Sequence, residues 1–405
     1  MAASAVRSKI GLALAGGGPV GGIYEVGAMA ALSEALEGLD FNGFDYFVGV
    51  SSGGFVAAAV ANGMHPGSLA RMLVENDTDE MFDPELLLRP ALGEYMKRAL
   101  SVPLLLFSSF RNYFSDPLHT GLFESLQRLS YALPSGIFDN AGVDELLRRM
   151  FSAYGRSNDF RELKHKLFLV ATDLDSGASV AFGSKGYDDV PISLAVQASA
   201  ALPGLFPPVN IGGRYFVDGA LIKTLHASVA LREGADLVIC INPLVPFDSA
   251  MAARHAHPDA RSLAPEHLVD GGLPVVLSQT FRAIIHSRMR TGMARYDLEY
   301  KNADVVLFEP KPDDEEMFFT NVFSYSSRSR LCEHAYQNTR SDLYRRRHIL
   351  GPIFARHGIH LNVPILCDKS RSLLPEKRRR QLASTIASLD SSLNHLSGWL
   401  ETHAS

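Results

Sequence analysis

Short apolar runs alternate with glycine-rich turns and helical patterns over the first 65 residues of the chain. Residues 10–15 and 44–50 are largely apolar runs of strand length, whereas residues 21–36 and 52–62 have the spacing of helices. Strands that alternate with helices at this spacing predict a parallel sheet with helices packed on it.

The same alternation returns between residues 167 and 308. We expect strands at residues 167–173, 215–217, 237–241 and 305–308, and helices at 192–200, 228–233 and 277–300, the last one long and amphipathic. The sequence therefore predicts an α/β fold, with a mainly parallel central sheet flanked by helices.

Two regions depart from this alternation. Residues 66–166 have the pattern of a mostly helical insertion, whose apolar stretch 86–114 fits either a lid or an ordinary packed subdomain. Residues 311–405 are helical and basic in pattern, and the run Lys377–Arg380 fits either contact with anionic lipid head groups or a solvated helix face. We expect a main domain over residues 8–310 and a mostly helical C-terminal extension over 311–405.

Composition narrows the class of protein. The chain has 405 residues, 46% of them hydrophobic, and a net charge of −5, which indicates a folded chain rather than a disordered one. Because 39 Lys and Arg are outnumbered by 44 Asp and Glu, we expect no nucleic-acid partner. The three cysteines are far apart and no metal-binding spacing occurs, so we expect no disulfide framework, metal or cofactor. The oligomeric state is not indicated.

The N-terminal residues bear on localisation. Arg7 and Lys9 precede a short apolar run that ends in Ala-x-Ala, as in a signal peptide. The run has only six residues, and cleavage after Ala15 would detach the glycines that follow, so we interpret residues 10–15 as a strand. No run of 18 apolar residues occurs, so no membrane-spanning helix is expected. We expect a cytoplasmic protein with peripheral contact to a membrane.

A glycine-rich loop follows the first predicted strand. Gly16-Gly17-Gly18-Pro19-Val20-Gly21 opens the first predicted helix, where successive glycines aim several backbone N–H groups into one concavity. Such a nest binds an anion, either a phosphate or a developing oxyanion. The loop lacks the Gly-Lys-Ser/Thr ending of a Walker motif, but it fits the dinucleotide pattern G-x-G-x-x-G loosely. A tight turn without a ligand is the third interpretation.

A second glycine motif follows the next predicted strand. Gly49-Val50-Ser51-Ser52-Gly53 fits G-x-S-x-G, in which glycines leave room for a sharp turn that exposes a serine hydroxyl. We expect Ser51 to be a nucleophile and Ser52 a polar residue at the start of the helix. Asp218, followed by Gly219, ends another apolar run and is a candidate base at the same edge of the sheet.

These three motifs together resemble the patatin-like phospholipase family, in the family's order. Two further stretches are similar to family sequence, residues 170–177 and 198–209, and the resemblance covers residues 8–245. It implies a patatin-like three-layer fold and a catalytic domain over 8–310. It also implies a serine acyl hydrolase that cleaves carboxyl esters of phospholipids, lysophospholipids or glycerides. The implied residues are Ser51 as nucleophile, Asp218 as base, Gly16, Gly17 and Gly18 as the oxyanion hole, and Gly21, Gly49, Gly53 and Gly219 as supporting glycines.

One residue departs from the family pattern, and alternatives remain open. The family usually carries Arg or Lys where this chain has Val20, so this position supplies no positive charge at the oxyanion. A membrane-associated binding or scaffold protein with a vestigial site is therefore one alternative, and nucleotide binding by the glycine loop is another. A Ser–Asp–His esterase is a third, with its histidine chosen from His226, His255, His257, His267 and His286.

Overall fold

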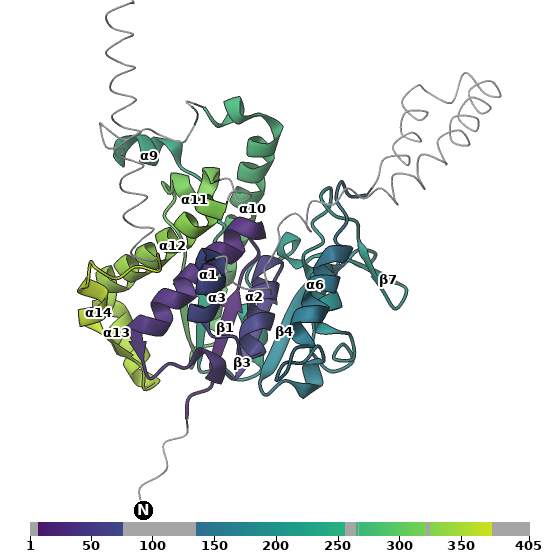
Figure 1. Ribbon diagram of the computed structural model, residues 1–405, viewed down its shortest axis with the longest axis horizontal. Coiled ribbons are helices and arrows are strands. Elements are labelled where there is room, and N and C mark those ends of the chain that lie inside the picture. Colours follow the sequence, from purple (N-terminus) through teal and green to yellow (C-terminus); the bar gives the residue numbers. More distant parts are fainter. Residues whose placement is uncertain (1–6, 76–134, 256–264, 266, 321–324, 375–405) are drawn as a thin grey trace, which may run out of the picture.

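The computed structural model describes residues 7–75, 135–255, 265, 267–320 and 325–374. Its centre is an eight-stranded sheet with the strand order β6-β7-β4-β3-β1-β8-β9, in which β5 pairs with β4 (Figure 1). The strands are β1 Ile10–Leu14, β3 Tyr46–Val50, β4 Lys166–Asp173, β5 Ser179–Phe182, β6 Val209–Ile211, β7 Arg214–Asp218, β8 Leu237–Ile241 and β9 Asp304–Phe308. Strands β4, β3, β1, β8 and β9 are parallel, which confirms the predicted mainly parallel sheet.

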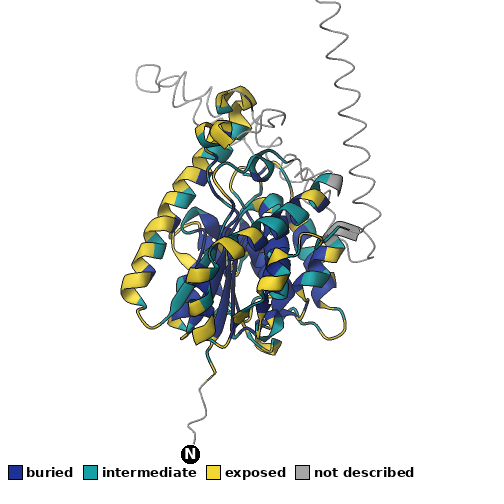
Figure 2. Cartoon of the chain, turned by 90° about the vertical axis from the view of Figure 1, so that its left-hand side faces the viewer, coloured by how far each residue is buried: buried dark blue, intermediate teal, exposed yellow. Residues whose placement is uncertain are grey.

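Each face of this sheet is covered by its own buried core. Leu12 and Leu14 of β1 pack with one set of helices, whereas Ala13 packs with another, because successive side chains of a strand point to opposite faces. The helices on the first face are α1 Gly18–Ala35, α2 Ser52–Ala61, α3 Pro66–Glu75, α6 Ala141–Phe151, α7 Ile192–Ser199 and α12 Tyr325–Arg345; those on the second are α8 Ala227–Arg232 and α10 Gly272–Glu299. The result is a three-layer sandwich with buried strands at its centre (Figure 2).

Helix α1 lies between the sheet and helix α12. It is buried on nearly all sides, as expected for a helix between two layers. A Cβ atom on Gly27 would lie 2.3 Å from the backbone oxygen of Cys332, so only glycine allows the two helices to pack this closely. Because α12 contributes Leu331 and Leu343 to the same core as α1, the C-terminal helices are part of the main body of the protein.

The remaining elements extend this body. The shorter helices are α9 Ser249–His255, α11 Glu315–Phe319, α13 Arg347–Arg356 and α14 Val363–Cys367, and the 3-10 turns are η1 Phe41–Gly43, η3 Phe160–Glu162, η4 Gly219–Leu221 and η5 Leu268–Gly271. A small two-stranded sheet joins β2 Leu36–Glu37 to β10 His360–Leu361. The predicted helical C-terminal region is thus confirmed over the described residues, and the boundary at residue 310 stays a prediction.

Several predicted features lie outside the described residues. These are the apolar stretch 86–114, the basic run 377–380 and most of the insertion, of which α3 and α6 are described. The expectation of no membrane-spanning helix rested on the lack of an unbroken apolar run. Among the described residues, however, Leu268–Glu299 forms one helical stretch long and apolar enough to cross a membrane by length and composition alone.

The direction of β7 differs from the repeated strand–helix pattern and determines the geometry of the site. Val170 of β4 pairs with Val50 of β3 on one side and with Ala181 of β5 on the other. Ala171, the next residue of β4, also pairs with β5. Its second partner is Asp218 of β7, which therefore lies on the side of β4 where β3 ends. Strands β3 and β7 therefore run toward each other along the same edge of β4 and meet end to end.

Candidate active site

Ser51 lies in a strained turn between β3 and α2. It has φ 54° and ψ −126°, and it is the one non-glycine residue with positive φ among the described residues. Such a conformation costs roughly 1–3 kcal/mol and persists only where the surroundings enforce it. A Cβ on Gly49 would lie 2.5 Å from the Gly53 oxygen, and one on Gly53 would lie 2.5 Å from the Ala15 oxygen. Both predicted glycines are therefore required by close backbone packing.

Ser199, at the end of α7, holds the backbone of this turn in place. The Ser51 N–H donates a hydrogen bond to the Ser199 hydroxyl oxygen (2.8 Å), and the Ser199 hydroxyl donates to the backbone oxygen of Val170 (2.6 Å). The Ser199 side chain is fully buried, so this bridge is shielded from water. The sequence reasoning did not identify Ser199, although it lies in one of the family-like stretches.

Asp218 is brought to Ser51 by the end-to-end meeting of β7 and β3. The Asp218 N–H donates to the Ala201 oxygen (3.0 Å), and its Oδ1 accepts a hydrogen bond from the Ala220 N–H (2.8 Å). The Ser51 hydroxyl lies next to the Asp218 carboxyl group and favours its ionised form. A Cβ on Gly219 would lie 2.3 Å from the Val170 oxygen, so this glycine allows the tight turn after Asp218.

The Asp218 carboxyl group is more basic than an ordinary aspartate. It is 3% exposed, and burial raises its pKa to about 6, although the hydrogen bond from the Ala220 N–H and the neighbouring Ser51 hydroxyl oppose this rise. The direction follows from desolvation, which disfavours the charged form. A carboxylate with this pKa accepts a proton more readily than an exposed one and is still ionised at pH 7.

The glycine-rich loop packs beside Ser51 at the start of α1. A Cβ on Gly16 would lie 3.1 Å from the Cβ of Ser51, so the loop backbone is in close contact with the serine. Gly17 and Gly21 pack against the ring of Pro243, and Gly18 has a φ of +60°. Gly17 and Gly18 stand at the N-cap and first position of α1, where the backbone N–H groups have no acceptor within the helix. These N–H groups and the helix dipole favour an anion at this point.

Two other residues of the motifs have structural positions. Val20 packs against the apolar core on the α1 side of the sheet, so this position supplies no positive charge. The Ser52 hydroxyl oxygen is buried and would lie 3.3 Å from a Cβ on Gly21, which places it against α1. Ser52 therefore has a structural position rather than an exposed hydroxyl, as expected for a polar residue at the start of the helix. Val20 lacks the positive charge that the family usually has at this point.

Glu25 is a buried carboxylic acid in α1 that the sequence reasoning missed. It is fully buried, and burial raises its pKa well above the usual range. Burial thus favours the neutral form of this carboxyl group, which follows the glycine loop by one helical turn. A single glutamate within an apolar helical pattern was the available sequence signal.

Among the described residues, none of the candidate histidines hydrogen-bonds to Ser51 or to the Asp218 carboxyl group. His226 is buried, and burial together with the charge of Lys223 lowers its pKa to about 3, so it stays neutral. His255 Nδ1 lies 2.7 Å from Asp313 Oδ2, and His286 Nε2 lies 3.7 Å from a Glu309 oxygen. His267 lies in an exposed turn before η5, and His257 lies outside the described residues.

An ion pair anchors the strand that carries Asp218. Arg214, the first residue of β7, donates hydrogen bonds to the Asp173 carboxylate and to the Tyr187 hydroxyl. Hydrogen bonds from the Ser176 backbone and side chain, together with Arg214, lower the pKa of Asp173 to about 2. The Asp173 carboxylate is therefore ionised and paired with Arg214. This ion pair stabilises the pairing of β4 with β7, so we do not assign Asp173 as a second base.

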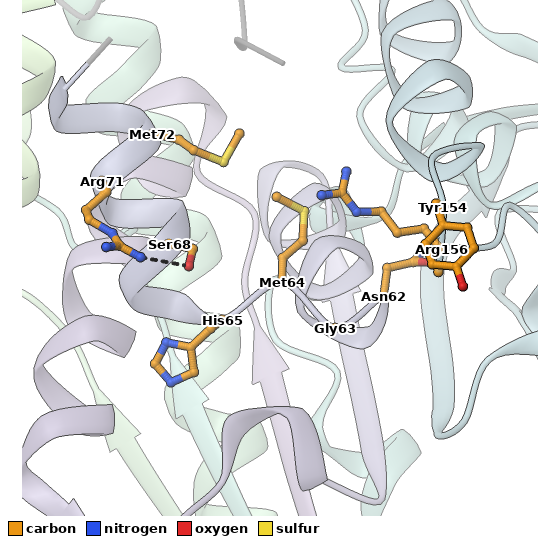
Figure 3. A pocket seen from close by; sticks show the side chains of 10 residues that line it. Asn62, Gly63, Met64, His65, Ser68, Arg71, Met72, Tyr154 and Arg156 are labelled. Atoms are coloured by element: carbon orange, nitrogen blue, oxygen red, sulfur yellow. Dashed lines mark hydrogen bonds between the residues drawn. The ribbon is translucent and has the colours of Figure 1, made fainter. Parts of the chain in front are cut away.

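The hollow drawn in Figure 3 is separate from this constellation. It has a volume of about 690 Å³ and is lined by residues that include Met64, Arg71 and Arg156. It lies beside Asn62, at the C-terminal end of α2, whereas Ser51 caps the N-terminal end of the same helix. The ten residues of α2 separate the two places by about 15 Å. No group of three or more metal-ligating side chains occurs within the described residues.

Comparison with known families gives a match to one family model. The family model of the patatin-like phospholipases matches residues 12–231, which is more than half of the chain and includes all three motifs. The chain belongs to the patatin-like phospholipase family.

The similar proteins share parts of this chain. An uncharacterized NTE family protein of Mycobacterium tuberculosis is 27% identical over 235 residues, 58% of this chain and 30% of that protein. Another, from Mycobacterium bovis, is 36% identical over 90 residues, 22% of this chain and 23% of that protein. The chain thus spans less than a third of the length of these relatives.

The solved structures that match this chain are more distant in sequence. VipD from Legionella pneumophila is 15% identical, with a TM-score of 0.34, covering 83% of this chain and 66% of that one. The human GIVD cytosolic phospholipase A2, solved with methyl gamma-linolenyl fluorophosphonate, is 13% identical, with a TM-score of 0.31, covering 83% of this chain and 58% of that one.

Proposed function

We propose that the protein is a serine lipid acyl hydrolase that cleaves carboxyl esters through an acyl-enzyme on Ser51. The observation that carries the proposal is the meeting of β3 and β7, which brings Ser51, in a turn with φ 54°, to the buried Asp218 carboxyl group. Strain at a single serine, next to a carboxylate with a raised pKa, is typical of a functional site. Membership in the patatin-like phospholipase family supports a lipid as the substrate.

In the first half of the reaction, Asp218 accepts the hydroxyl proton of Ser51 while Ser51 Oγ attacks the ester carbonyl carbon. The C–O double bond becomes a single bond, and the negative charge develops on the carbonyl oxygen. The tetrahedral species then collapses, the bond to the alcohol breaks, and Asp218 returns the proton to the leaving alkoxide. The acyl group remains on Ser51.

The backbone N–H groups of the glycine loop stabilise the developing oxyanion. Gly16, Gly17 and Gly18 are the proposed donors, because their loop contacts Ser51 and opens helix α1. Loss of one such donor typically lowers the rate by about 100- to 1,000-fold. Because the donors are backbone groups, Val20 in place of a basic residue leaves them intact.

In the second half, a water molecule attacks the acyl carbon and gives a proton to Asp218. The new tetrahedral species expels Ser51 Oγ, which regains that proton, and the carboxylic acid is released. An alcohol in the place of water gives acyl transfer by the same steps. We expect phospholipids, lysophospholipids or glycerides to be substrates.

The experiment is hydrolysis of a soluble nitrophenyl ester and of a lipid panel by the purified protein. Ser51→Ala is expected to lower the turnover of each substrate by at least 1,000-fold. Ser52→Ala is the matched control, because its hydroxyl lies against α1 and is expected to be dispensable. Unchanged turnover in Ser51→Ala would contradict the proposal.

A second pair of variants distinguishes the dyad from a triad. Asp218→Asn is expected to abolish turnover, whereas His226→Ala is expected to leave turnover per folded molecule near the wild-type rate. Near-normal activity in Asp218→Asn, with loss in His226→Ala, would instead favour a Ser–Asp–His site.

The oxyanion loop has its own matched control. Gly18 and Gly212 both have a φ of +60° and open space where a Cβ would lie. Alanine at either site therefore introduces similar backbone strain, of about 1 kcal/mol. We expect Gly18→Ala to lower kcat by at least tenfold more than Gly212→Ala, and equal losses would argue against the loop's role.

A further inference from the structure

Helix α10 presents an apolar face to solvent. Val269 in the turn before the helix, and Leu273, Leu277, Phe281 and Ile284 within it, are 44–69% exposed. They are spaced by four or three residues, which places them along one face of a helix. Between Gly271 and Ser287 the one formally charged residue is Arg282, and its side chain is buried. This face, which we call the α10 stripe, is defined as Leu273, Val276, Leu277, Phe281 and Ile284.

The opposite face of α10 is fixed to the body of the protein. Arg282 donates hydrogen bonds to the backbone oxygens of Val245 (3.2 Å) and Met317 (3.5 Å). Met289 and Tyr296 are buried in the core on the second face of the sheet. Although α10 is long and apolar enough to cross a membrane, these contacts keep it packed along the protein. Its outer face alone is available for a partner.

The same helix touches both loops of the proposed site. Arg288 donates to the backbone oxygen of Leu221 (2.9 Å), three residues after Asp218. Gln279 exchanges hydrogen bonds with the backbone of Phe247, in the segment whose Pro243 packs against the glycine loop. The amino-terminal end of α10 rises above the upper end of the sheet, where β1 and β3 end (Figure 1). The α10 stripe therefore lies on the side of the molecule that carries Ser51.

Basic residues follow the stripe directly. Arg288 and Arg290 are exposed on the next turn of α10. An uncharged apolar face bordered by arginines matches the boundary of an anionic bilayer, in which apolar side chains enter the acyl region and arginines meet the head groups. Asp270, before the stripe, is engaged by the His267 backbone N–H.

We propose that the α10 stripe, with Arg288 and Arg290 at its border, docks the protein on the surface of an anionic phospholipid membrane. This inference deepens the proposed function, on which it rests, because it delivers aggregated lipid to the edge of the sheet that carries Ser51. Docking is peripheral: the outer face of α10 enters the interface, and the helix stays attached to the sheet.

The test measures binding to vesicles separately from hydrolysis. Ser51→Ala protein is mixed with phosphatidylcholine vesicles with and without phosphatidylglycerol, and the bound fraction is measured by flotation. In this background Phe281→Asp, and separately Leu277→Asp, is expected to weaken binding at least about tenfold, since each removes a buried apolar side chain from the interface. Arg290→Glu is expected to weaken binding to the anionic vesicles alone, by roughly fivefold or more.

Leu298→Asp is the matched control. Leu298 is on the same helix and is 73% exposed, but it lies beyond the arginine border among Arg295, Asp297 and Glu299. We expect it to bind vesicles as the parent protein does. Equal weakening by Leu298→Asp and Phe281→Asp, or no vesicle binding by the parent protein, would overturn the proposal.

Two other occupants of the stripe give different results, and each overturns the proposal. If a second copy of the chain covers the stripe, Phe281→Asp converts an oligomer to a monomer in sedimentation and vesicle binding is unaffected. If another segment of this chain covers it, Leu277→Asp lowers the melting temperature by several degrees and vesicle binding is again unaffected.

Hydrolysis in the Ser51-containing protein separates this inference from the proposed function. With Phe281→Asp, turnover of a soluble nitrophenyl ester is expected to stay near wild type, while turnover of vesicle phospholipid falls at least tenfold. Loss of both reactions in Ser51→Ala, with vesicle binding unchanged, would support the catalytic proposal whatever the fate of the stripe.

Discussion

Burial makes Asp218 a better base and at the same time destabilises the fold. A pKa raised to about 6, from the usual value near 4, means that the folded protein holds this proton more tightly than the unfolded chain. Stability from this group is fully present below pH 4 and is lost as the pH rises through 6. The ionised carboxyl group is therefore a cost to stability at neutral pH.

We expect Asp218→Asn to be more stable than the wild type at pH 8, by on the order of 2 kcal/mol, because the amide needs no ionised form. The difference is expected to vanish near pH 4. Urea unfolding of both proteins at pH 4, 6 and 8 checks this. A variant that is less stable than the wild type at pH 8 would show that burial of the ionised carboxylate does not destabilise the fold.

The same pKa predicts how the rate depends on pH. Because the base must be ionised to accept the Ser51 proton, kcat/KM for a soluble ester is expected to rise through a half-maximal value near pH 6 and then level off. A profile flat from pH 5 to 8 would mean that another group is the base.

We expect Ser199 to affect the rate of catalysis although its side chain does not contact the substrate. Ser199→Ala removes the acceptor of the strained Ser51 N–H, so kcat is expected to fall by about 10- to 100-fold with little change in KM. Ser193→Ala is the control, since Ser193 is equally buried in α7 but hydrogen-bonds to Asn158 instead. Kinetics with a soluble ester, scaled to the folded fraction, tests the comparison; similar losses of kcat in both variants would refute a positioning role.

At the scale of elements, the crossing of α1 and α12 depends on a glycine. Of the described helical glycines, Gly27 would bring its Cβ closest to an atom of another helix. Gly27→Ala would place a Cβ 2.3 Å from the Cys332 oxygen, so the helices must separate. We expect a loss of at least about 2 kcal/mol in the free energy of unfolding, measured by urea denaturation. Gly22→Ala, on the same helix with its nearest contact at 3.5 Å, is expected to be neutral or slightly stabilising. Equal effects of the two variants would contradict the close crossing.

Six of the eight strands of the central sheet could be predicted from sequence, whereas β5, β6 and the direction of β7 could not. Apolar runs identify β1, β3, β4 and β8 because these strands are buried on both faces. Such runs carry no information on strand direction. Gly212 and Gly213, both with positive φ, form the hairpin turn between β6 and β7, and a Gly-Gly pair is a known sign of such a turn. The turn gives β7 the direction in which it pairs antiparallel to β4.

The candidate residues show a similar division. Ser51, Asp218 and the glycines were identified because their motifs are local in sequence, and the structure places them together. Ser199 and Asp173 were not assigned roles, because their hydrogen bonds cross 148 and 41 residues of sequence and depend on the pairing of distant elements. The sequence does not predict the exposed apolar face of α10 either, since an amphipathic pattern does not indicate which face packs against the protein.

At the scale of the whole molecule, one sheet joins a proposed catalytic centre to a proposed membrane surface. The carboxyl edge of the sheet carries Ser51, and α10 extends beyond it on the second face (Figures 1 and 2). The C-terminal helices close the first face through the α1–α12 contact. The central claim within this arrangement is that Ser51 is a nucleophile activated by Asp218.

The most direct test of that claim is the intact mass of the protein after reaction with an alkyl fluorophosphonate. We predict one covalent adduct, located on the peptide that contains Ser51, absent in Ser51→Ala and formed at least 100-fold more slowly in Asp218→Asn. Wild-type protein that remains unmodified, or an adduct that persists in Ser51→Ala, would contradict the account.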